Sequence, residues 1–152
     1  MIRERLPFQL LDNYAGLTPT DNDQGNAGID LSAGLSSNGD WVIPVGGERT
    51  IDTGLAVVIP EGYYGRVVLR SGHGFKRGLS CHIGTVDATY RGEIKVLVRN
   101  HSQEVQRIQP GERFAQLIVQ PYVICEVEQV FGDIAEAYPS DRGTKGFGSS
   151  GL

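Results

Sequence analysis

Short apolar runs, each bounded by glycine, proline or another turn-forming residue, recur through most of the chain. They are WVIPV (41–45), RTIDTGLAVVIP (49–60), YGRVVLR (64–70), EIKVLVRN (93–100), RFAQLIVQPY (113–122) and ICEVEQVF (124–131). Several alternate with a period of two, as Ile94, Val96 and Val98 do around Lys95, and this pattern is typical of a strand with one buried face. The one helix candidate, residues 71–78, is short and glycine-rich. We therefore predict an all-β fold, either a sandwich, a jelly roll or a barrel.

The length of 152 residues, with 39% of them hydrophobic, fits one domain that can bury a core. We expect residues 1–138 to form this domain, and the glycine- and serine-rich residues 139–152 to form a flexible arm. Glycine, at 21 residues, is about twice as frequent as usual. That abundance fits tight turns and places where backbone approaches a ligand.

The formal net charge of −4 gives no overall attraction to nucleic acid or to an anionic membrane, so we expect neither as a partner. No apolar run approaches the roughly 20 residues that span a bilayer. The first residues, MIRERLPFQL, lack the apolar core of a signal peptide, so we expect a cytosolic protein. Cys81 and Cys125 show no CxxC spacing and are expected to be small buried side chains in a reducing compartment.

Three polar features at strand ends are candidates for a functional site. In LRSGHG, Arg70 and Ser71 precede two glycines. Successive backbone amides there could form an anion-binding nest, with Arg70 as a planar cationic fork; the alternative is a turn with a surface arginine. Asp30, between two apolar residues, either caps a turn or directs its carboxylate at a metal's water shell or at an arginine. Gln116 interrupts an apolar run and is either solvent-facing or a neutral donor in a site.

GTVDATYRGEI (84–94) is the most informative stretch. Asp87, Ala88 and Thr89 lie between two strand-like runs, which is the pattern of a β-hairpin. Asp87 either begins the turn or acts as a general base beside the aromatic ring of Tyr90, a pairing that suits a flat ligand.

The last stretch, RGTKGFGSSG (142–151), places one arginine, one lysine and one phenylalanine among glycines. It is either a frayed tail or a segment that carries Arg142 and Phe147 to a ligand. The three histidines, His73, His82 and His101, show no metal-ligand spacing, although His73 lies within the candidate anion loop. The sequence contains neither a P-loop nor a Rossmann glycine motif.

Five stretches resemble, in order and approximate spacing, the five motifs of the trimeric dUTPase family: AGIDL, RSGHG, GTVDATYRGEI, GERFAQL and RGTKGFGSSG. The match spans residues 27–151. The resemblance implies a jelly-roll β-barrel, which agrees with the strand-rich pattern. It also implies hydrolysis of dUTP to dUMP and pyrophosphate with Mg²⁺, and a homotrimer whose sites combine residues from all three subunits.

The resemblance also implies roles for the residues around the predicted hairpin. Asp87 would activate the water that attacks the α-phosphorus. Tyr90 would pack on the deoxyribose and leave no room for a 2′-hydroxyl. The backbone of three preceding residues would pair with the edge of uracil: Ile83, Gly84 and Thr85.

Further roles follow for the other motifs. Asp30 would support the site through arginine and through the water shell of magnesium. In the arm, Arg142 would meet the γ-phosphate and Phe147 would lie over the uracil ring. Two more arm residues would contact substrate: Gly148 and Ser149. Four residues would hold the phosphates: Arg70, Ser71, Gly72 and Gln116.

Three residues depart from the common family pattern, namely Thr89, His73 and Lys145, while the named catalytic groups are intact. Two alternatives remain. A dCTP deaminase, or its bifunctional relative, shares the fold but needs a proton-shuttling carboxylate in the pyrimidine pocket. A regulatory binding protein on the same fold would need no hydrolysis.

Overall fold

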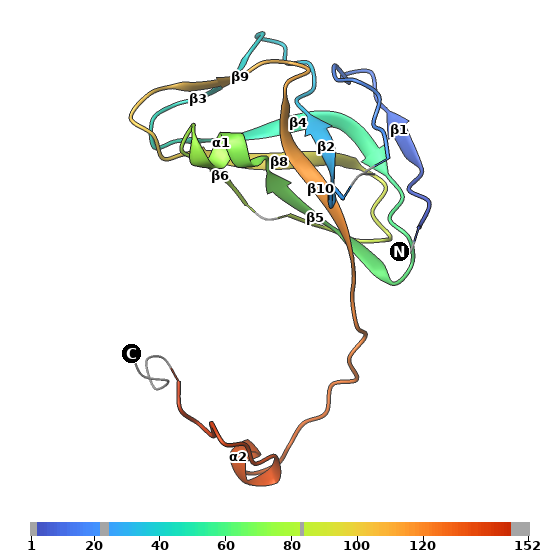
Figure 1. Ribbon diagram of the computed structural model, residues 1–152, viewed down its shortest axis with the longest axis vertical. Coiled ribbons are helices and arrows are strands. Elements are labelled where there is room, and N and C mark those ends of the chain that lie inside the picture. Colours follow the sequence, from blue (N-terminus) through green and yellow to red (C-terminus); the bar gives the residue numbers. More distant parts are fainter. Residues whose placement is uncertain (1–2, 22–24, 83, 147–152) are drawn as a thin grey trace. The chain divides into compact units, whose positions relative to one another are not determined.

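The computed structural model describes residues 3–21, 25–82 and 84–146 (Figure 1). It divides into a first unit, residues 1–122, and a second unit, residues 123–152. The predicted boundary after residue 138 falls inside the second unit and stays a prediction. The strands are β1 (Phe8–Leu10), β2 (Gly28–Ser32), β3 (Trp41–Ile43), β4 (Glu48–Val57), β5 (Tyr63–Leu69), β6 (Leu79–Cys81), β7 (Gly84–Val86), β8 (Glu93–Asn100), β9 (Gln106–Ile108) and β10 (Arg113–Pro121), and the helices are α1 (Ser71–Phe75) and α2 (Ile134–Ala137).

The strands of the first unit form antiparallel sheets around one core. Two four-stranded sheets have the orders β1-β4-β8-β6 and β2-β10-β5-β7, and a two-stranded sheet pairs β3 with β9. One cluster of buried apolar side chains joins both larger sheets, with Leu31 and Leu117 from one and Ile51 and Val96 from the other. The predicted all-β jelly roll is confirmed.

Strand β8 shows why the period of two was a reliable signal. Ile94, Val96 and Val98 are buried in the core, whereas Lys95 and Arg99 on the other face are exposed. Successive side chains of a strand point to opposite faces of the sheet, so alternation in the sequence becomes alternation in burial. The short helix predicted within residues 71–78 is also present, as α1.

Two strand predictions were wrong. The strands on either side of the Asp87–Tyr90 turn do not form a hairpin, because β7 pairs with β5 whereas β8 pairs with β4 and β6. The intervening residues 87–92 are a longer connection than the two-residue loop of a tight hairpin, and they carry the chain from one sheet to the other. Residues 124–131 are not a strand. Strands need a pairing partner, and this segment has none within the part of the chain that the structure describes.

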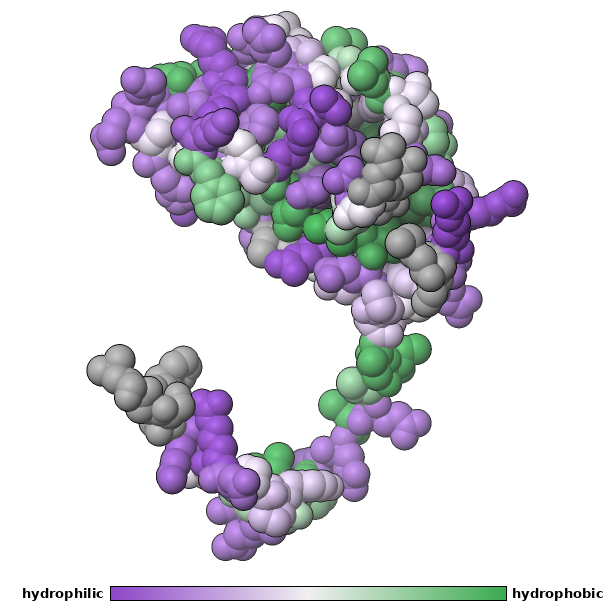
Figure 2. Space-filling view, in the orientation of Figure 1, coloured by the Kyte–Doolittle hydropathy of each residue, from purple (hydrophilic) through white to green (hydrophobic). Residues whose placement is uncertain are grey.

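The second unit exposes much of its apolar surface. In its extended first part Val123 and Ile124 are each 83% exposed and Val127 is 99% exposed, and Figure 2 shows apolar side chains gathered where this unit begins. Asp133 caps α2 by accepting a hydrogen bond from the Ala135 amide at 2.8 Å.

Both cysteines are free thiols. Cys81 is half-buried, and burial raises the pKa of its thiol. Cys125 is exposed, so the expectation that it is buried was wrong. Among the described residues, no helix is both long enough and apolar enough to cross a bilayer.

Candidate active site

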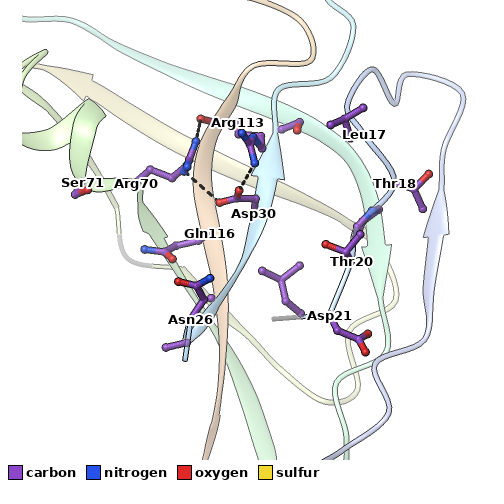
Figure 3. Close-up of a pocket in the computed structure, with 15 residues that line it drawn as sticks. Leu17, Thr18, Thr20, Asp21, Asn26, Asp30, Arg70, Ser71, Arg113 and Gln116 are labelled. Atoms are coloured by element: carbon purple, nitrogen blue, oxygen red, sulfur yellow. Dashed lines mark hydrogen bonds and ion pairs between the residues drawn. The ribbon is translucent and has the colours of Figure 1, made fainter. Parts of the chain in front are cut away.

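A cavity of about 540 Å³ lies where the ends of β2, β5 and β10 meet (Figure 3). Its wall combines four of the predicted site residues with a segment from the N-terminal part of the chain. The lining residues are 17–21, 26–30, Ser32, Arg70, Ser71, Arg113 and Gln116.

Asp30 is the centre of the polar wall of this cavity. Its Oδ1 lies 3.1 Å from Arg70 Nε, and its Oδ2 lies 3.1 Å from Arg113 Nη1. Figure 3 shows both guanidinium groups turned toward the one carboxylate. Of the two readings of Asp30, the structure therefore shows a carboxylate directed at arginine. Two cations around one anion leave a local excess of positive charge at this cluster, which favours an anionic ligand there. Asp21, elsewhere in the wall, adds one further negative charge.

Strand pairing brings these three groups together. Asp30 of β2 lies opposite Gln116 of β10, and Arg113 lies opposite Ser32, with an irregularity in the register between Arg113 and Ala115. Since Asp30 and Ser32 share one face of β2, Arg113 is a diagonal neighbour of Asp30. The irregularity adds a residue to β10, as in a bulge, which redirects the side chain at its end.

Arg70 directly follows β5 and is fixed through its backbone and its side chain. Its amide donates to Phe114 O at 2.9 Å, so the pairing with β10 continues past the end of the strand. Its Nη1 donates to Arg113 O at 3.3 Å. Both contacts reach β10, so the same strand orients Arg70 and supplies Arg113.

Gln116 lines the cavity beside a glycine that leaves room for it. A Cβ at Gly28 would lie 2.3 Å from Gln116 Oε1 and 2.9 Å from its Cδ. Any larger residue at position 28 would therefore push the amide group of Gln116 away from its place in the wall.

The predicted anion nest is smaller than the sequence indicated. The amides of His73 and Gly74 donate to Arg70 O at 3.0 and 3.3 Å, so they are used to close the first turn of α1. At most the amides of Ser71 and Gly72 remain for a ligand. A Cβ at Gly72 would meet no atom within 4 Å. Contacts within this subunit therefore do not explain why residue 72 is a glycine.

Asp87 and Tyr90 lie outside this cavity. Both are exposed, the Tyr90 amide closes the turn on Asp87 O at 3.0 Å, and the Tyr90 hydroxyl donates to Glu93 O at 3.0 Å. Val86 pairs with Gly65, so Asp87 is level with Tyr64. Arg70 lies six residues further along, or about 20 Å at the usual rise of a strand. One chain therefore does not bring Asp87 and Arg70 together.

The remaining predicted residues are spread over both units. Gly84 and Thr85 lie on β7, paired with Val67 and Arg66. Arg142 is exposed in the second unit, where its Nε donates to Lys145 O at 2.9 Å. Four predicted residues lie outside the described residues: Ile83, Phe147, Gly148 and Ser149.

Two parts of the cavity wall were missed by sequence reasoning. Arg113 was visible only as the third residue of the GERFAQL stretch, and nothing in the sequence says that it pairs with Asp30. Residues 17–21 carry no motif, and only their nearness to AGIDL could have drawn attention to them.

Comparison with known proteins gives consistent matches over nearly the whole chain. The dUTPase family model matches residues 16–151. A deoxyuridine 5′-triphosphate nucleotidohydrolase of Rhizobium etli (strain CIAT 652) is 40% identical over 153 residues, covering 99% of this chain and 96% of the relative. The dUTPase of Staphylococcus bacteriophage 80alpha with dUpNHpp is 29% identical, with a TM-score of 0.81 over 99% of this chain and 100% of that one. A mutant dUTPase from phage phi11 of S. aureus, which coordinates a structural Mg(II) ion, is 25% identical, with a TM-score of 0.72 over 86% and 99% of the chains.

Proposed function

The chain belongs to the dUTPase family of deoxyuridine 5′-triphosphate nucleotidohydrolases, and from this premise we propose how its residues divide the hydrolysis of dUTP to dUMP and pyrophosphate. The reaction would keep uracil out of DNA and supply dUMP for thymidylate synthesis. The observation that carries the mechanism is the cluster of Arg70, Arg113 and Asp30 in the wall of the cavity.

This cluster is proposed to hold the triphosphate. Phosphoryl transfer needs little covalent help and depends mainly on positioning and on neutralising charge. Arg70 offers a planar fork that suits phosphate oxygens, and Asp30 fixes its direction. Ser71 and Gln116 line the same cavity and would add neutral hydrogen bonds, with the Gly72 amide beside them.

Asp87 is proposed to be the general base. Water is a poor nucleophile, and a carboxylate fixed at a turn can orient a water molecule and take its proton. The exposed position of Asp87 leaves it accessible to such a water. Tyr90, which belongs to the same turn as Asp87, would pack on the deoxyribose. The backbone of Ile83, Gly84 and Thr85 would pair with uracil.

Magnesium fits this site as an ion carried by the triphosphate. Within the described residues, no group of three or more His, Cys, Asp or Glu side chains gathers to hold a metal. The acidic residues of the cavity are Asp21 and Asp30. Mg²⁺ bound by substrate phosphates usually keeps several waters, so Asp30 would contact it through water. When bound, the ion neutralises charge on the phosphates.

The C-terminal arm is proposed to close over the substrate. Arg142 would meet the γ-phosphate, Phe147 would cover the uracil ring, and Gly148 and Ser149 would contact the substrate. Closing such a segment excludes bulk water and completes the phosphate clamp. The high glycine content of residues 142–151 supports this proposal, since glycine lets a segment change its path.

We also propose that the active unit is a homotrimer with shared sites. The separation of about 20 Å between Asp87 and Arg70 along the strands supports this, because both must act on one triphosphate. The exposed apolar side chains of Val123, Ile124 and Val127 support it as well. Apolar surface of this kind is usually covered in an assembly.

The mechanism is tested by product analysis. The purified protein is incubated in Mg²⁺ with dUTP, dCTP, dTTP or UTP, and we expect dUMP and pyrophosphate from dUTP alone. Asp87→Asn should lower kcat about a thousandfold, because an amide cannot take the proton. It should still bind dUpNHpp. Asp40→Asn, in the loop between β2 and β3, removes a carboxylate outside the cavity and should keep the wild-type rate.

Each other outcome has a distinct meaning. Hydrolysis of dUTP that survives Asp87→Asn would retain the reaction and discard the base. Conversion of dCTP would favour the deaminase alternative. If none of the four nucleotides is converted but dUpNHpp still binds, a regulatory binding protein would be favoured.

A further inference from the structure

A second polar cluster contacts the Arg70 loop, which is defined here as residues 70–77 and includes α1. Glu112 lies in the turn before β10, and one of its carboxylate oxygens contacts two side chains. His73 Nε2 and Arg77 Nη1 each lie 2.8 Å from this atom, Oε1. The Gln109 amide donates to the other oxygen, Oε2, at 2.9 Å. The cluster thus ties α1 and the residues after it to the β9–β10 turn.

The cluster is more than a chance contact at the surface. The His73 side chain is only 12% exposed and that of Glu112 29% exposed. Burial raises the pKa of the Glu112 carboxyl, but the Gln109 amide, His73 and the charge of Arg77 together lower it by more. The contacts therefore stabilise the charged carboxylate strongly enough to outweigh its partial removal from water.

Helix α1 depends on such contacts. It covers only Ser71–Phe75, contains two glycines and has no buried residue, and Phe75 is 92% exposed. A single turn of this composition is unstable in isolation, and no apolar packing holds it. The hydrogen bond from His73 to Glu112 is therefore a main side-chain anchor of the helix.

The two clusters form one ring around the loop. The His73 amide donates to Arg70 O at 3.0 Å, and Arg70 pairs with Asp30, which pairs with Arg113. Arg113 follows Glu112 in the chain, and Glu112 binds the His73 side chain. The loop is held by Asp30 at one end and by Glu112 at the other.

We propose that His73 is a positioning residue for substrate binding, which acts by anchoring α1 to Glu112 so that Arg70 and Ser71 face the triphosphate. This inference rests on the proposed phosphate-binding role of these two residues. Since His73 does not line the cavity, its effect reaches the substrate through the loop. Its loss should therefore weaken substrate binding more than it slows the chemical step at Asp87.

Two variants at position 73 provide the test. Both carry a side-chain amide, but the two side chains differ in length by one methylene group. In His73→Gln the side-chain amide can still reach Glu112, whereas in His73→Asn it is too short. We expect His73→Asn to raise the Kd for dUpNHpp and the KM for dUTP about tenfold, with kcat changed less than about threefold. His73→Gln should stay within about twofold of wild type. The matched control is His101→Leu, which removes a histidine hydrogen bond of 2.7 Å to Ser80 and should change neither constant.

The thermal midpoint of each variant is measured at the same protein concentration, so that unfolding is not mistaken for weak binding. Equal Kd values for His73→Asn and His73→Gln would overturn the proposal, as would a loss confined to kcat. Arg70→Ala is measured in parallel. If Arg70→Ala does not weaken dUpNHpp binding, then the phosphate-binding role itself fails. If Arg70→Ala weakens binding and His73→Asn does not, only the role of His73 fails.

Discussion

At the scale of single residues, Asp30 holds two guanidinium groups with one carboxylate, at 3.1 Å from both Arg70 and Arg113. Without its charge, the two cations repel each other and lose their fixed directions. We expect Asp30→Asn to weaken dUpNHpp binding about tenfold, or about 1.4 kcal/mol, in titration calorimetry. Asp52→Asn is the control, because that carboxylate pairs with Lys95 at 2.8 Å outside the cavity. Unchanged affinity in Asp30→Asn would mean that the arginines keep their places without it.

Glu93 makes a second prediction at this scale, about stability and pH. Its Oε1 accepts hydrogen bonds of 2.7 Å from Asn13 Nδ2 and from the Gly54 amide, and Oε2 lies 3.3 Å from Lys95. Burial raises the pKa of Glu93, but these partners lower it by more, to below the usual value of a glutamate. A carboxylate with a lowered pKa in the folded state adds stability that is fully present above its pKa in the unfolded chain. This stability is lost as the pH falls through the lower pKa of the folded state.

Glu93→Gln should therefore lower the free energy of unfolding by about 1 kcal/mol near pH 7. The difference from wild type should shrink at an acidic pH below the lowered pKa of Glu93, where wild-type Glu93 is itself protonated. Urea unfolding of both proteins at the neutral and the acidic pH, at one protein concentration, measures this difference in unfolding free energy. A difference as large at the acidic pH as at the neutral one would show that the charge of Glu93 is not the source of its contribution.

At the scale of elements, β4 depends on a glycine where its pairing with β8 becomes irregular. Gly54 lies between Asp52 and Ala56, at the shift in register, with φ of 66°. A Cβ there would lie 2.6 Å from backbone atoms of Tyr14. Gly54→Ala should therefore cost about 3 kcal/mol or more, through strain and a clash that backbone cannot relieve.

Gly62→Ala separates the two causes. Gly62 has φ of 82°, but a Cβ at that position would meet nothing within 4 Å. It should cost only about 1 kcal/mol, from backbone strain alone. Equal losses of unfolding free energy in the two variants would show that contact with Tyr14 does not constrain β4.

The elements also show how far the sequence could predict the fold. The alternation in β8 was sufficient, because burial on one face of a strand is a local pattern. The sequence of the Asp87–Tyr90 turn was not sufficient to predict a hairpin. The pairing of the two flanking strands depends on the whole sheet and not on the turn between them. Residues 124–131 have strand-like composition but no partner strand within the described residues, and composition cannot say whether a partner exists.

At the scale of the whole molecule, the same limit applies to the site. The motifs identified Asp30, Arg70, Ser71 and Gln116, which the fold brings to one cavity. They also identified Asp87, which the fold places elsewhere, and they missed Arg113. The spacing of motifs along a chain does not predict which side chains pair across neighbouring strands. It also does not say whether residues meet within one subunit or between two.

Mixing two inactive variants tests whether the site is shared. Asp87→Asn and Arg70→Ala subunits, each inactive alone, are unfolded together at equal amounts and refolded as mixed assemblies. If each site takes Asp87 from one subunit and Arg70 from its neighbour, about a quarter of the sites in randomly mixed, symmetric trimers regain both groups. The mixture should then hydrolyse dUTP at about a quarter of the wild-type rate. Each parent refolded alone is the control. If both groups act within one chain, every chain still lacks one of them, and the mixture stays as inactive as its parents.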